Sequence, residues 1–574
     1  MRIETDKATA ITIISLLEQH GVRDVVVSPG SRNTPLINAL AVSDSLVKHV
    51  VIDERAAAFM ALGMARTADS TVALVCTSGT ALLNYAPAVA EAYYQGVSLL
   101  LLTADRPKQW IDQDDSQTIH QFEALGPFVK GSFDLPDINS GDREMMWYAN
   151  RTINQAILLS QKEKKGPVHI NLQFNNPLTR GLELDIKPER KVTLIDSLSA
   201  PSRETVAELA ERAKGKKILL TAGFMNPDHR FSKSVSYFNS LPNTFVLAES
   251  LANLHVKGLD TGIDRTLAFT EGEEKAMLYP DIVITTGGPL VSRFMKTWLR
   301  DAPALEHWSL DSSDMFADCF FHLTLKIEAD PHLLLSALTN RLIKGNDIGG
   351  YPASAFNYKK QWQEVVSRGK RRLFEYISSL GVDGWSDFTA LHYILQNVPD
   401  RYNIHFSNGT SVRYGELFAK ESQHALYSNR GTSGIEGSTS TAIGSALKYK
   451  GDTLLVTGDM SFLYDLGGLS LTQAPSNFRI VVLYNGGGDI FRFIPTTKNL
   501  ETREQYCSCR GLINSVAIDS LAEAFGYRLV KVMSMTELRE SLPEFLNIEG
   551  KSILLIDTSG IDNAEVLSGY FKFE

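Results

Sequence analysis

Short apolar runs alternate with longer stretches of helical periodicity along most of the chain. In the first third, these runs predict buried strands at about 23–28, 72–76, 97–103 and 168–173. Thr5 or Asp6 is placed to cap a first helix that ends at Gly21. Strand, turn and helix in this order are typical of a parallel sheet covered by helices.

The same alternation restarts twice, each time after a stretch of poor periodicity, at about 180–200 and 344–354. The second block predicts strands at 218–221, 244–248, 282–285 and 324–327. The third predicts a long amphipathic helix at about 356–380 and strands at 403–407, 453–457, 479–484 and 552–556. We therefore predict an α/β protein of three domains with parallel sheets flanked by helices, at 1–180, 195–345 and 356–574.

The composition of the chain argues against several classes of function. With 44% hydrophobic and 21% charged residues, the 574-residue chain reads as globular, and each domain is long enough to bury its own core. A net charge of −9 argues against nucleic acid as the partner. No apolar run approaches the ~18 residues that a spanning helix needs, so we expect no membrane insertion. Four cysteines without metal-binding spacing, and no signal peptide, predict a cytoplasmic protein.

Candidate chemistry is clearest in the third block. Asp459 directly follows one predicted strand, and Asn485 follows the next, with glycines at 486–488. In a parallel sheet both residues lie at carboxyl ends of strands, where ligands bind. Their oxygens suit Mg²⁺, and a glycine carbonyl can complete the shell. The backbone N–H groups that follow Asp459, including that of Ser461, can bind a phosphate. The alternative is an ordinary strand-to-helix turn with a capping aspartate.

Glu54 is the second candidate. It lies between a strand end and an alanine-rich helix, where we expect its carboxylate to be nearly buried. Burying a carboxylate is costly unless it has a partner or a function. The alternative is an acidic residue in the first turn of a helix, favoured by the helix dipole.

The spacing of Asp459 and Asn485 resembles the cofactor motif of thiamine-diphosphate enzymes, although Met460 stands where that family usually has glycine. The resemblance implies thiamine diphosphate with Mg²⁺ (or Mn²⁺) as cofactors. It implies a pyrimidine-binding domain at 1–180, a central Rossmann-like domain at 195–345 and a diphosphate-binding domain at 356–574. It also implies a homodimer or homotetramer with the active site at a subunit interface. The cofactor-binding residues would be Glu54, Ile435, Gly458, Asp459, Met460, Ser461, Asn485 and Gly487, with Asp459, Asn485 and Gly487 on the metal.

Within that superfamily, five segments resemble the 2-succinyl-5-enolpyruvyl-6-hydroxy-3-cyclohexene-1-carboxylate synthases, the MenD family. They are SPGSRNTPL (28–36), TSGTALLNYAPAVAEA (77–92), LTADRP (102–107), SQTIHQ (116–121) and SNRGTSGIEG (428–437). The resemblance implies a transferase of menaquinone biosynthesis that decarboxylates 2-oxoglutarate and adds the succinyl-semialdehyde carbanion to isochorismate. Both substrates carry two carboxylates, which arginine binds bidentately.

By the same resemblance, Glu54, Arg32 and Gln117 would be catalytic. Arg413 and Arg430 would hold the carboxylate of the succinyl part, and Arg293 would hold isochorismate. The substrate residues would be Arg32, Arg106, Gln117, Arg293, Asn408, Arg413, Arg430, Ile490 and Phe491. The chain departs from the family's pattern at Ser292, where a basic residue is expected, at Gly409, which replaces serine, and at Glu436, which replaces aspartate.

Two other functions stay open on sequence alone. One is a different thiamine-diphosphate 2-oxo acid decarboxylase or carboligase, which the pair Arg413 and Arg430 argues against. The other is a non-catalytic protein that has kept the fold. The presence of Glu54 together with Asp459 and Asn485 argues against that second function, since a decayed relative would have little reason to keep both ends of a cofactor site.

Overall fold

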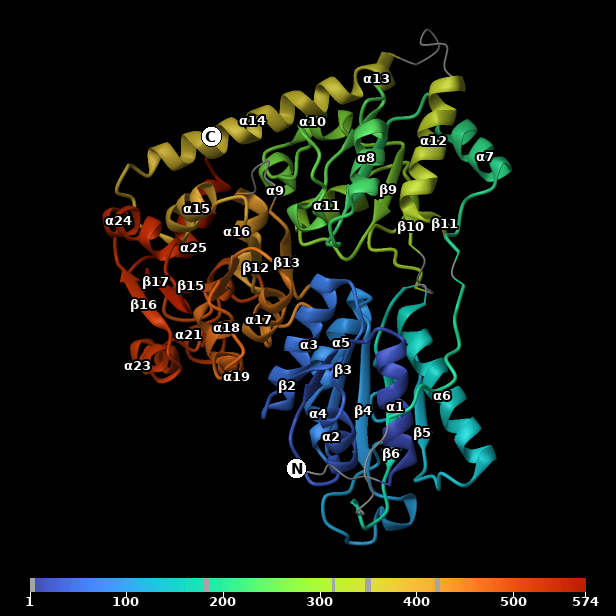
Figure 1. Cartoon of the computed structure of the whole chain (residues 1–574). Helices are drawn as coiled ribbons and strands as arrows, with labels where there is room; N and C mark the ends of the chain where they lie inside the picture. The colour runs from blue at the N-terminus through green and yellow to red at the C-terminus, as the bar shows by residue number, and fades with distance from the viewer. Residues whose placement is uncertain are drawn as a thin grey trace. The chain divides into compact units, whose positions relative to one another are not determined.

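Three β-sheets, each flanked by helices, form in turn along the chain (Figure 1). The computed structural model describes residues 6–162, 164–179, 186–195, 197–311, 315–345, 353–418 and 424–573. Its backbone forms two compact units. Unit 1 comprises Met1–Asp196, Gly431–Lys450 and Leu463–Phe478, and unit 2 comprises Ser197–Arg430, Gly451–Phe462 and Arg479–Glu574. The predicted α/β class is confirmed, whereas the limits of the three domains stay a prediction.

The sheet of unit 1 has six parallel strands in the order β2-β1-β3-β4-β6-β5. The strands are β1 (Asp24–Val27), β2 (Val47–Val50), β3 (Val72–Cys76), β4 (Leu99–Asp105), β5 (Ser132–Leu135) and β6 (Val168–Gln173). The helices are α1 (Ala8–Gln19), α2 (Thr34–Ala41), α3 (Glu54–Ala68), α4 (Ala81–Asn84), α5 (Ala86–Gln95) and α6 (Arg143–Gln161), with short 3₁₀ turns η1 (Lys108–Trp110) and η2 (Gly126–Phe128). The four inner strands are buried over their whole length.

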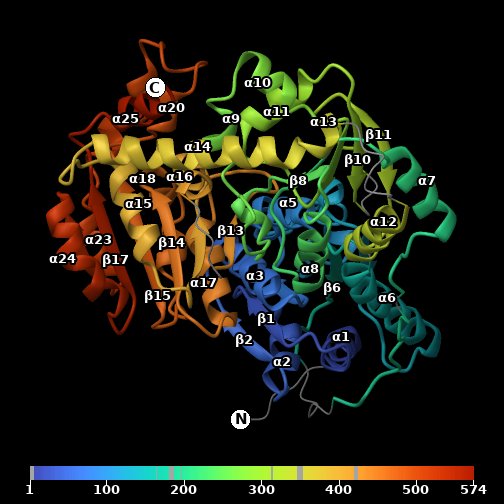
Figure 2. The same cartoon turned by 90° about the horizontal axis from the view of Figure 1, so that it is seen from above.

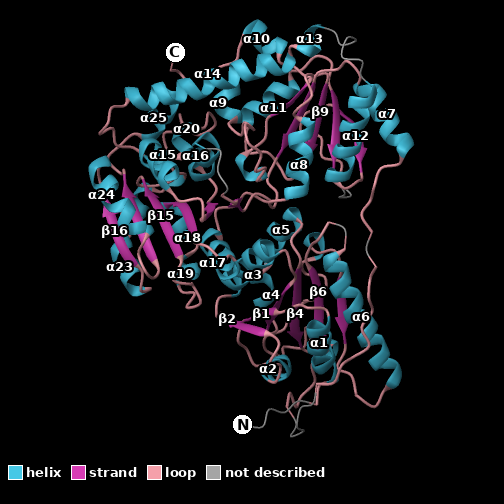
Figure 3. Ribbon diagram, turned by 45° about the horizontal axis from the view of Figure 1, so that its top comes forward, coloured by secondary structure: helices cyan, strands magenta, loops and turns pink. Residues whose placement is uncertain are grey.

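Unit 2 contains two sheets, shown as magenta arrows in Figure 3. The first has five parallel strands in the order β11-β10-β9-β7-β8. They are β7 (Ile218–Ala222), β8 (Thr244–Val246), β9 (Ile282–Thr286), β10 (Glu306–Leu310) and β11 (Leu323–Ile327). Around it lie α7 (Arg203–Ala213), α8 (His229–Phe238), η3 (Ser250–Ala252), α9 (Ile263–Leu267), α10 (Gly272–Met277), α11 (Arg293–Arg300) and α12 (Pro331–Gly345).

The second sheet of unit 2 has the order β13-β12-β14-β15-β17-β16. Its strands are β12 (Asn403–Phe406), β13 (Leu426–Ser428), β14 (Thr453–Gly458), β15 (Phe478–Tyr484), β16 (Arg528–Val532) and β17 (Ser552–Asp557). The C-terminal helices are α13 (Ala353–Phe356), α14 (Tyr358–Ser379), α15 (Asp387–Asn397), α16 (Thr410–Phe418), α17 (Ser438–Lys448), α18 (Asp459–Tyr464), α19 (Leu466–Leu469), α20 (Ile490–Phe493), α21 (Arg503–Tyr506), α22 (Arg510–Ile513), α23 (Ile518–Ala524), α24 (Met535–Leu546) and α25 (Asn563–Tyr570). Strand β12 is parallel to β13 and β14, and β17 is parallel to β15 and β16.

The long helix α14 joins the two sheets of unit 2, and Figure 2 shows it running past the helices of both. Near its start, the Trp362 ring stacks on Phe245 of β8 at a centroid distance of 5.1 Å. Near its end, the ring centroid of Tyr376 lies 5.4 Å from that of Phe388 of α15. Because the ends of α14 pack into different cores, the two sheets are held within one compact unit.

Helices α3 and α17 pack backbone against backbone inside unit 1. A Cβ atom built on Gly63 of α3 would lie 1.9 Å from the carbonyl oxygen of Thr441. A Cβ atom built on Gly444 of α17 would lie 2.0 Å from the carbonyl oxygen of Met60. Each helix therefore needs a glycine where the other crosses it, and α17 completes the core of a unit whose sheet lies more than 250 residues earlier.

The predicted helix over 356–380 is confirmed as α14, and Gly21 ends the first helix with a positive φ of 73°. The predicted cap of that helix is wrong for Asp6, because Lys7 holds the cap position without a side-chain hydrogen bond, and Thr5 lies outside the described residues. In the first linker, residues 186–195 contain no helix or strand. Most of the second linker lies outside the described residues. Among the helices that the structure describes, none is long and apolar enough to cross a membrane.

Candidate active site

Asp459 lies at the carboxyl end of β14, where the strand passes directly into α18. Its Oδ2 accepts the backbone N–H groups of Gly486 and Gly487 at 3.0 and 2.9 Å, and its Oδ1 accepts that of Met460 at 2.7 Å. The side chain is only 2% exposed, and this burial raises the pKa of its carboxyl group to about 6 although the three N–H donors oppose the shift. A cation beside it would restore the ionised form.

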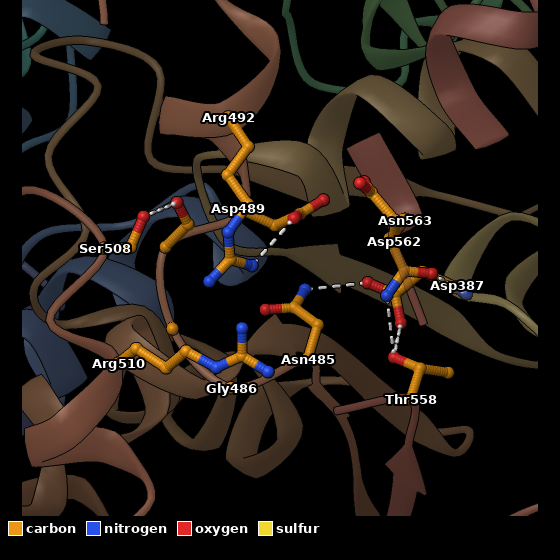
Figure 4. A network of polar contacts seen from close by, with 12 residues as sticks. Asp387, Asn485, Gly486, Asp489, Arg492, Ser508, Arg510, Thr558, Asp562 and Asn563 are labelled. Atoms are coloured by element: carbon orange, nitrogen blue, oxygen red, sulfur yellow. Dashed lines mark hydrogen bonds and ion pairs between the residues drawn. The ribbon is translucent and has the colours of Figure 1, made fainter. Parts of the chain in front are cut away.

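Asn485 lies at the end of the neighbouring strand β15 and is oriented by a buried acid, as Figure 4 shows. Its Nδ2 donates to Oδ2 of Asp387 at 2.8 Å. The other oxygen of Asp387 accepts the hydroxyl of Thr558 at 2.6 Å, and the backbone N–H of Asp387 donates to Asn563 at 2.7 Å. Asp387 is fully buried, which raises the pKa of its carboxyl group to about 7. This network turns the amide oxygen of Asn485 away from Asp387.

These residues fit a hard metal ion. The Oδ1 atom of Asn485 is buried and, among the described residues, has no hydrogen-bond partner. Gly487 has a φ of +122°, and a Cβ atom there would lie 2.2 Å from the carbonyl oxygen of Ser508, so only glycine fits. One carboxylate, one amide oxygen and one main-chain carbonyl form an oxygen set typical of Mg²⁺. In the described part of the chain, no cluster of three or more His, Cys, Asp or Glu residues offers a different site.

The other residues predicted around the diphosphate lie in the same turn. Ser461 is buried, and Gly458 has open space where a side chain would stand. The sulfur of Met460 would lie 2.6 Å from a Cβ atom built on Gly488, so this methionine lies against the glycine turn. Met460, at the position where the family usually has glycine, therefore places its side chain against Gly488 and leaves the space beside Gly458 open.

Asn408 and Arg430 lie after β12 and β13, which are adjacent parallel strands. The Asn408 side chain donates to the carbonyl oxygen of Asn429 at 2.7 Å and accepts from Nη1 of Arg430 at 2.9 Å. This pair fixes the guanidinium of Arg430 near the carboxyl edge of the sheet. Gly409, with a φ of +106°, follows directly and has no side chain to add to the contact.

Arg413 and Arg293 line one pocket of about 680 Å³ within unit 2. Arg413 lies on α16 and is partly buried, whereas Arg293 is exposed at the start of α11. Burial lowers the pKa of Arg413, and the nearby Arg293 and Arg430 lower it further, while Asp264 opposes the shift. Neither Arg413 nor Arg293 forms a hydrogen bond or ion pair with another described residue. The two guanidinium groups are therefore free to bind an anion.

Ile490 and Phe491 begin the short helix α20, and its last residue, Phe493, lines the same pocket together with Ile494 and Pro495, which follow the helix. Arg492 anchors this segment through ion pairs to Asp489 at 3.0 Å and Glu504 at 2.8 Å. Figure 4 shows Arg492 turned toward Asp489. Three residues that line the pocket therefore follow closely after Asn485 along the chain.

Glu54 is the first residue of α3 in unit 1, and Asp53 caps the helix by accepting the N–H groups of Arg55 and Ala56. The expectation of a nearly buried carboxylate is wrong, because Glu54 is only partly buried in this chain. The loss of solvent still raises the pKa of Glu54, and the neighbouring Asp53 adds to the effect. Glu54 is thus both a first-turn acid and a carboxyl group with an elevated pKa.

Arg32, Arg106 and Gln117 gather near the carboxyl ends of the strands of unit 1. Arg32 is 7% exposed and donates to the carbonyl oxygen of Phe174 at 3.0 Å. Burial lowers the pKa of Arg32, and the nearby Arg106 lowers it further. Arg106 is paired with Asp115, and Gln117, with a φ of +63°, donates to the carbonyl oxygen of Ser78 at 3.1 Å.

The segment that carries Ile435 belongs to unit 1 and lies against α3. A Cβ atom on Gly437 would lie 2.2 Å from the ring of Phe59, so the backbone there lies directly on that helix. Upstream, the buried Glu91 accepts the N–H groups of Gly431 and Thr432 at 2.7 and 2.6 Å. Ile435 and Glu54 therefore belong to one compact unit, whereas the predicted metal residues belong to the other.

The sequence did not predict two residues that hold parts of the candidate site in place, Asp387 and Glu91. Asp387 follows Ser386 at a helix start, and such a pair is indistinguishable from an ordinary cap. Glu91 falls within a motif used for recognition, but its partners lie about 340 residues away, and only the fold brings them together. A buried acid in an otherwise small and apolar helix was the available signal for Glu91.

The comparisons with known proteins agree with this geometry. Residues 8–124 match the N-terminal TPP binding domain of thiamine pyrophosphate enzymes, and residues 408–558 match the C-terminal TPP binding domain. The chain is 38% identical to the 2-succinyl-5-enolpyruvyl-6-hydroxy-3-cyclohexene-1-carboxylate synthase of Porphyromonas gingivalis, over 99% of this chain and 97% of that protein. It is 34% and 33% identical to the proteins of that name from Bacteroides fragilis and Bacteroides thetaiotaomicron, over 99% of both chains in each case. The chain thus belongs to the 2-succinyl-5-enolpyruvyl-6-hydroxy-3-cyclohexene-1-carboxylate synthase (MenD) family of thiamine-diphosphate enzymes.

Proposed function

We propose that the protein decarboxylates 2-oxoglutarate and transfers the resulting four-carbon unit to isochorismate, as a transferase of menaquinone biosynthesis. The observation that carries the proposal is the pair Arg413 and Arg293, which face one pocket without a partner among the described residues. The partly buried guanidinium of Arg413 is costly to leave unpaired, so its place beside Arg293 in one pocket supports a ligand with carboxylates. Both proposed substrates carry two.

Asp459, Asn485 and the carbonyl oxygen of Gly487 are the residues we assign to Mg²⁺ or Mn²⁺, which would hold the diphosphate of thiamine diphosphate. The bound cofactor supplies the electron sink that makes decarboxylation possible. The orphaned Asn485 oxygen and the desolvated Asp459 carboxyl support this assignment, because a divalent cation would satisfy both. Gly458, Met460 and Ser461 would flank the diphosphate.

Glu54 is the residue we assign to hydrogen bonding with the aminopyrimidine ring. A carboxyl group whose pKa is raised by burial carries its proton closer to neutral pH, which suits exchange of a proton with a ring nitrogen. The segment of Ile435 lies in the same compact unit, which is compatible with a role in shaping the cofactor. Arg32, Arg106 and Gln117 would contact the reacting groups.

The remaining substrate residues all belong to unit 2. Arg413 and Arg430 would bind the succinyl carboxylate, with Asn408 holding Arg430 in place. Arg293 would bind isochorismate, and Ile490 and Phe491 would pack on the bound substrates. From its membership of this family, we also propose that the protein forms a homodimer or homotetramer with its active site at a subunit interface, and that it works in the cytoplasm.

The test is the product formed by the purified protein with thiamine diphosphate and Mg²⁺. With 2-oxoglutarate and isochorismate together, we expect carbon dioxide and one new adduct by mass spectrometry. Pyruvate in place of 2-oxoglutarate is the control, because a carboligase of smaller 2-oxo acids would use it. Faster turnover of pyruvate than of 2-oxoglutarate would exclude the proposed activity and favour that second kind of enzyme.

A further inference from the structure

Gln121 is a fully buried amide of unit 1 whose hydrogen bonds join three segments of the chain. Its Oε1 accepts the backbone N–H of Gly79 at 2.7 Å. Its Nε2 donates to the carbonyl oxygen of Ala104, near the end of β4, at 3.3 Å and to Oδ1 of Asn171, on β6, at 3.0 Å. The turn that contains Gly79 is therefore attached through Gln121 to two inner strands of the sheet.

Two acidic side chains decide which way these amides face. Nδ2 of Asn171 donates to Oδ2 of Asp105 at 2.9 Å and to Oδ1 of Asp134 at 3.0 Å. Because carboxylate oxygens accept hydrogen bonds, the nitrogen of the Asn171 amide faces them and its oxygen faces Gln121. That oxygen requires a donor, so the nitrogen of Gln121 faces Asn171 and the Gln121 oxygen is left for the N–H of Gly79. The orientation of Gln121 is thus fixed from the sheet.

The turn that Gln121 holds is the one on which the side chain of Gln117 rests. Nε2 of Gln117 donates to the carbonyl oxygen of Ser78 at 3.1 Å. A Cβ atom built on Gly79 would lie 3.0 Å from Cγ of Gln117, so this side chain also packs against the turn. The C=O of Ser78 and the N–H of Gly79 belong to one planar peptide group, so a hydrogen bond that fixes the N–H also fixes the direction of the C=O.

We infer that Gln121 is a positioning residue for Gln117, because it holds the peptide group of Ser78 and Gly79 to which the Gln117 side chain is bonded. The inference rests on the proposed function, in which Gln117 contacts the reacting groups. Gln121 is itself fully buried, so it acts through that peptide group. Misplacing a reacting contact by about 1 Å can cost about 10²-fold in rate.

Three variants of Gln121 change its contact with the turn in different ways. Gln121→Met has a similar length but leaves the N–H of Gly79 without its acceptor. Gln121→Asn keeps the amide but is one methylene shorter, so it cannot reach both Gly79 and Asn171, and it takes the place of Gln121→Met if that variant does not fold. Gln121→Glu keeps an oxygen toward Gly79, and its protonated carboxyl group can still donate to Asn171.

Asn154→Leu is the matched control for the loss of a buried amide. Asn154 lies on α6 and is 1% exposed. Its Nδ2 donates to the carbonyl oxygens of Asn150 and Arg190 at 2.9 and 3.1 Å. We expect Asn154→Leu to lower the melting temperature, because these groups lose their partner, and to leave turnover within about twofold of the wild type.

Each Gln121 variant is made alone and together with Gln117→Ala, and adduct formation from 2-oxoglutarate and isochorismate is measured on the holoenzyme. The assay is run at pH 6, where a buried carboxyl group at position 121 keeps its proton. We expect Gln121→Met to lower turnover about tenfold in the otherwise wild-type protein but less than about twofold in the Gln117→Ala background. Gln121→Glu should stay within about threefold of the wild type. Hydrogen exchange of the Gly79 amide should rise in Gln121→Met and stay unchanged in Asn154→Leu.

The outcomes separate the role of Gln121 from the proposed function. If Gln121→Met lowers turnover by the same factor in both backgrounds, Gln121 does not act through Gln117 and the inference is wrong. If Gln121→Glu is as impaired as Gln121→Met, the contact with Gly79 is not what matters, which also overturns the inference. The proposed function stands in both cases, because the wild type still forms the adduct. If the wild type forms no adduct, the proposed function fails; if Gln117→Ala keeps full turnover, the assignment of Gln117 fails. In either of these two cases Gln121 has nothing to position.

Discussion

Replacing Asp387 by alanine should weaken the binding of Mg²⁺ and thiamine diphosphate, although Asp387 would not touch either. Its carboxylate holds Nδ2 of Asn485 at 2.8 Å, which directs the amide oxygen toward the proposed metal. Without that partner the buried amide of Asn485 can rotate, so that either its oxygen or its nitrogen faces the proposed metal. The neighbouring Thr558 hydroxyl loses its acceptor in the same change.

The size of the expected loss follows from the role of Asp387, which orients a proposed metal ligand without binding the metal itself. Removing a group that orients a metal ligand typically costs about 10–100-fold in metal affinity. That loss corresponds to about 1.4–2.8 kcal/mol of binding free energy. The buried groups left without partners add about 1–3 kcal/mol each to the cost of folding, so the variant should also melt earlier.

Asp387→Asn is the matched variant. Its amide oxygen can still accept from Asn485, and its amide nitrogen can face Thr558, whose hydroxyl oxygen can accept. We expect its cofactor affinity to stay within about threefold of the wild type. Affinity is measured by titrating thiamine diphosphate at fixed Mg²⁺ and following the rise in melting temperature from each variant's own apo value. Equal cofactor affinity in Asp387→Ala and wild type would refute the orienting role of Asp387.

Substitutions at three further residues test the proposed site directly. Glu54→Gln should bind Mg²⁺ and cofactor normally but reduce turnover by about 10²–10⁴, the range of an acid–base group, and near-normal turnover in the product assay would remove Glu54 from the mechanism. Asp459→Ala should abolish the rise in melting temperature on adding thiamine diphosphate with Mg²⁺; an undiminished rise would contradict the metal assignment. Arg413→Ala should raise the KM for 2-oxoglutarate, whereas Arg413→Lys should recover it in part, since lysine keeps the charge but not the bidentate geometry. A defect confined to isochorismate would mean that Arg413 and Arg293 have exchanged roles.

The sequence predicted strands well where they are buried on both faces. The run at 72–76 was located to the residue as β3, and the run at 168–173 as β6, because continuous apolar residues mark inner strands of a parallel sheet. Four of the strands that were not predicted, β2, β5, β13 and β16, lie at sheet edges. Edge strands such as β2 are largely exposed, so their composition lacks the apolar run.

Some residues of the candidate site could likewise be predicted from the sequence, and others could not. Asp459 and Asn485 could be found because both follow inner strands and the chain marks the turn with glycines. Asp387 could not, because its meaning depends on a contact with Asn485, which lies 98 residues away. The burial of Glu54 was overestimated, because the local pattern reports on the helix that follows it and not on what covers its first turn.

The close crossing of α3 and α17 at their glycines limits where the chain can be cut into fragments that fold on their own. Every residue from Ala56 to Arg66 is buried, and α17 lies directly on that helix. A fragment ending near residue 180 would therefore present a bare, alanine-rich helix to water, although its own sheet is complete. Expressed alone, such a piece should aggregate, and co-expression with the remainder should rescue it. The helices that cover the N-terminal sheet are thus complete only after α17 (Ser438–Lys448) has been synthesised.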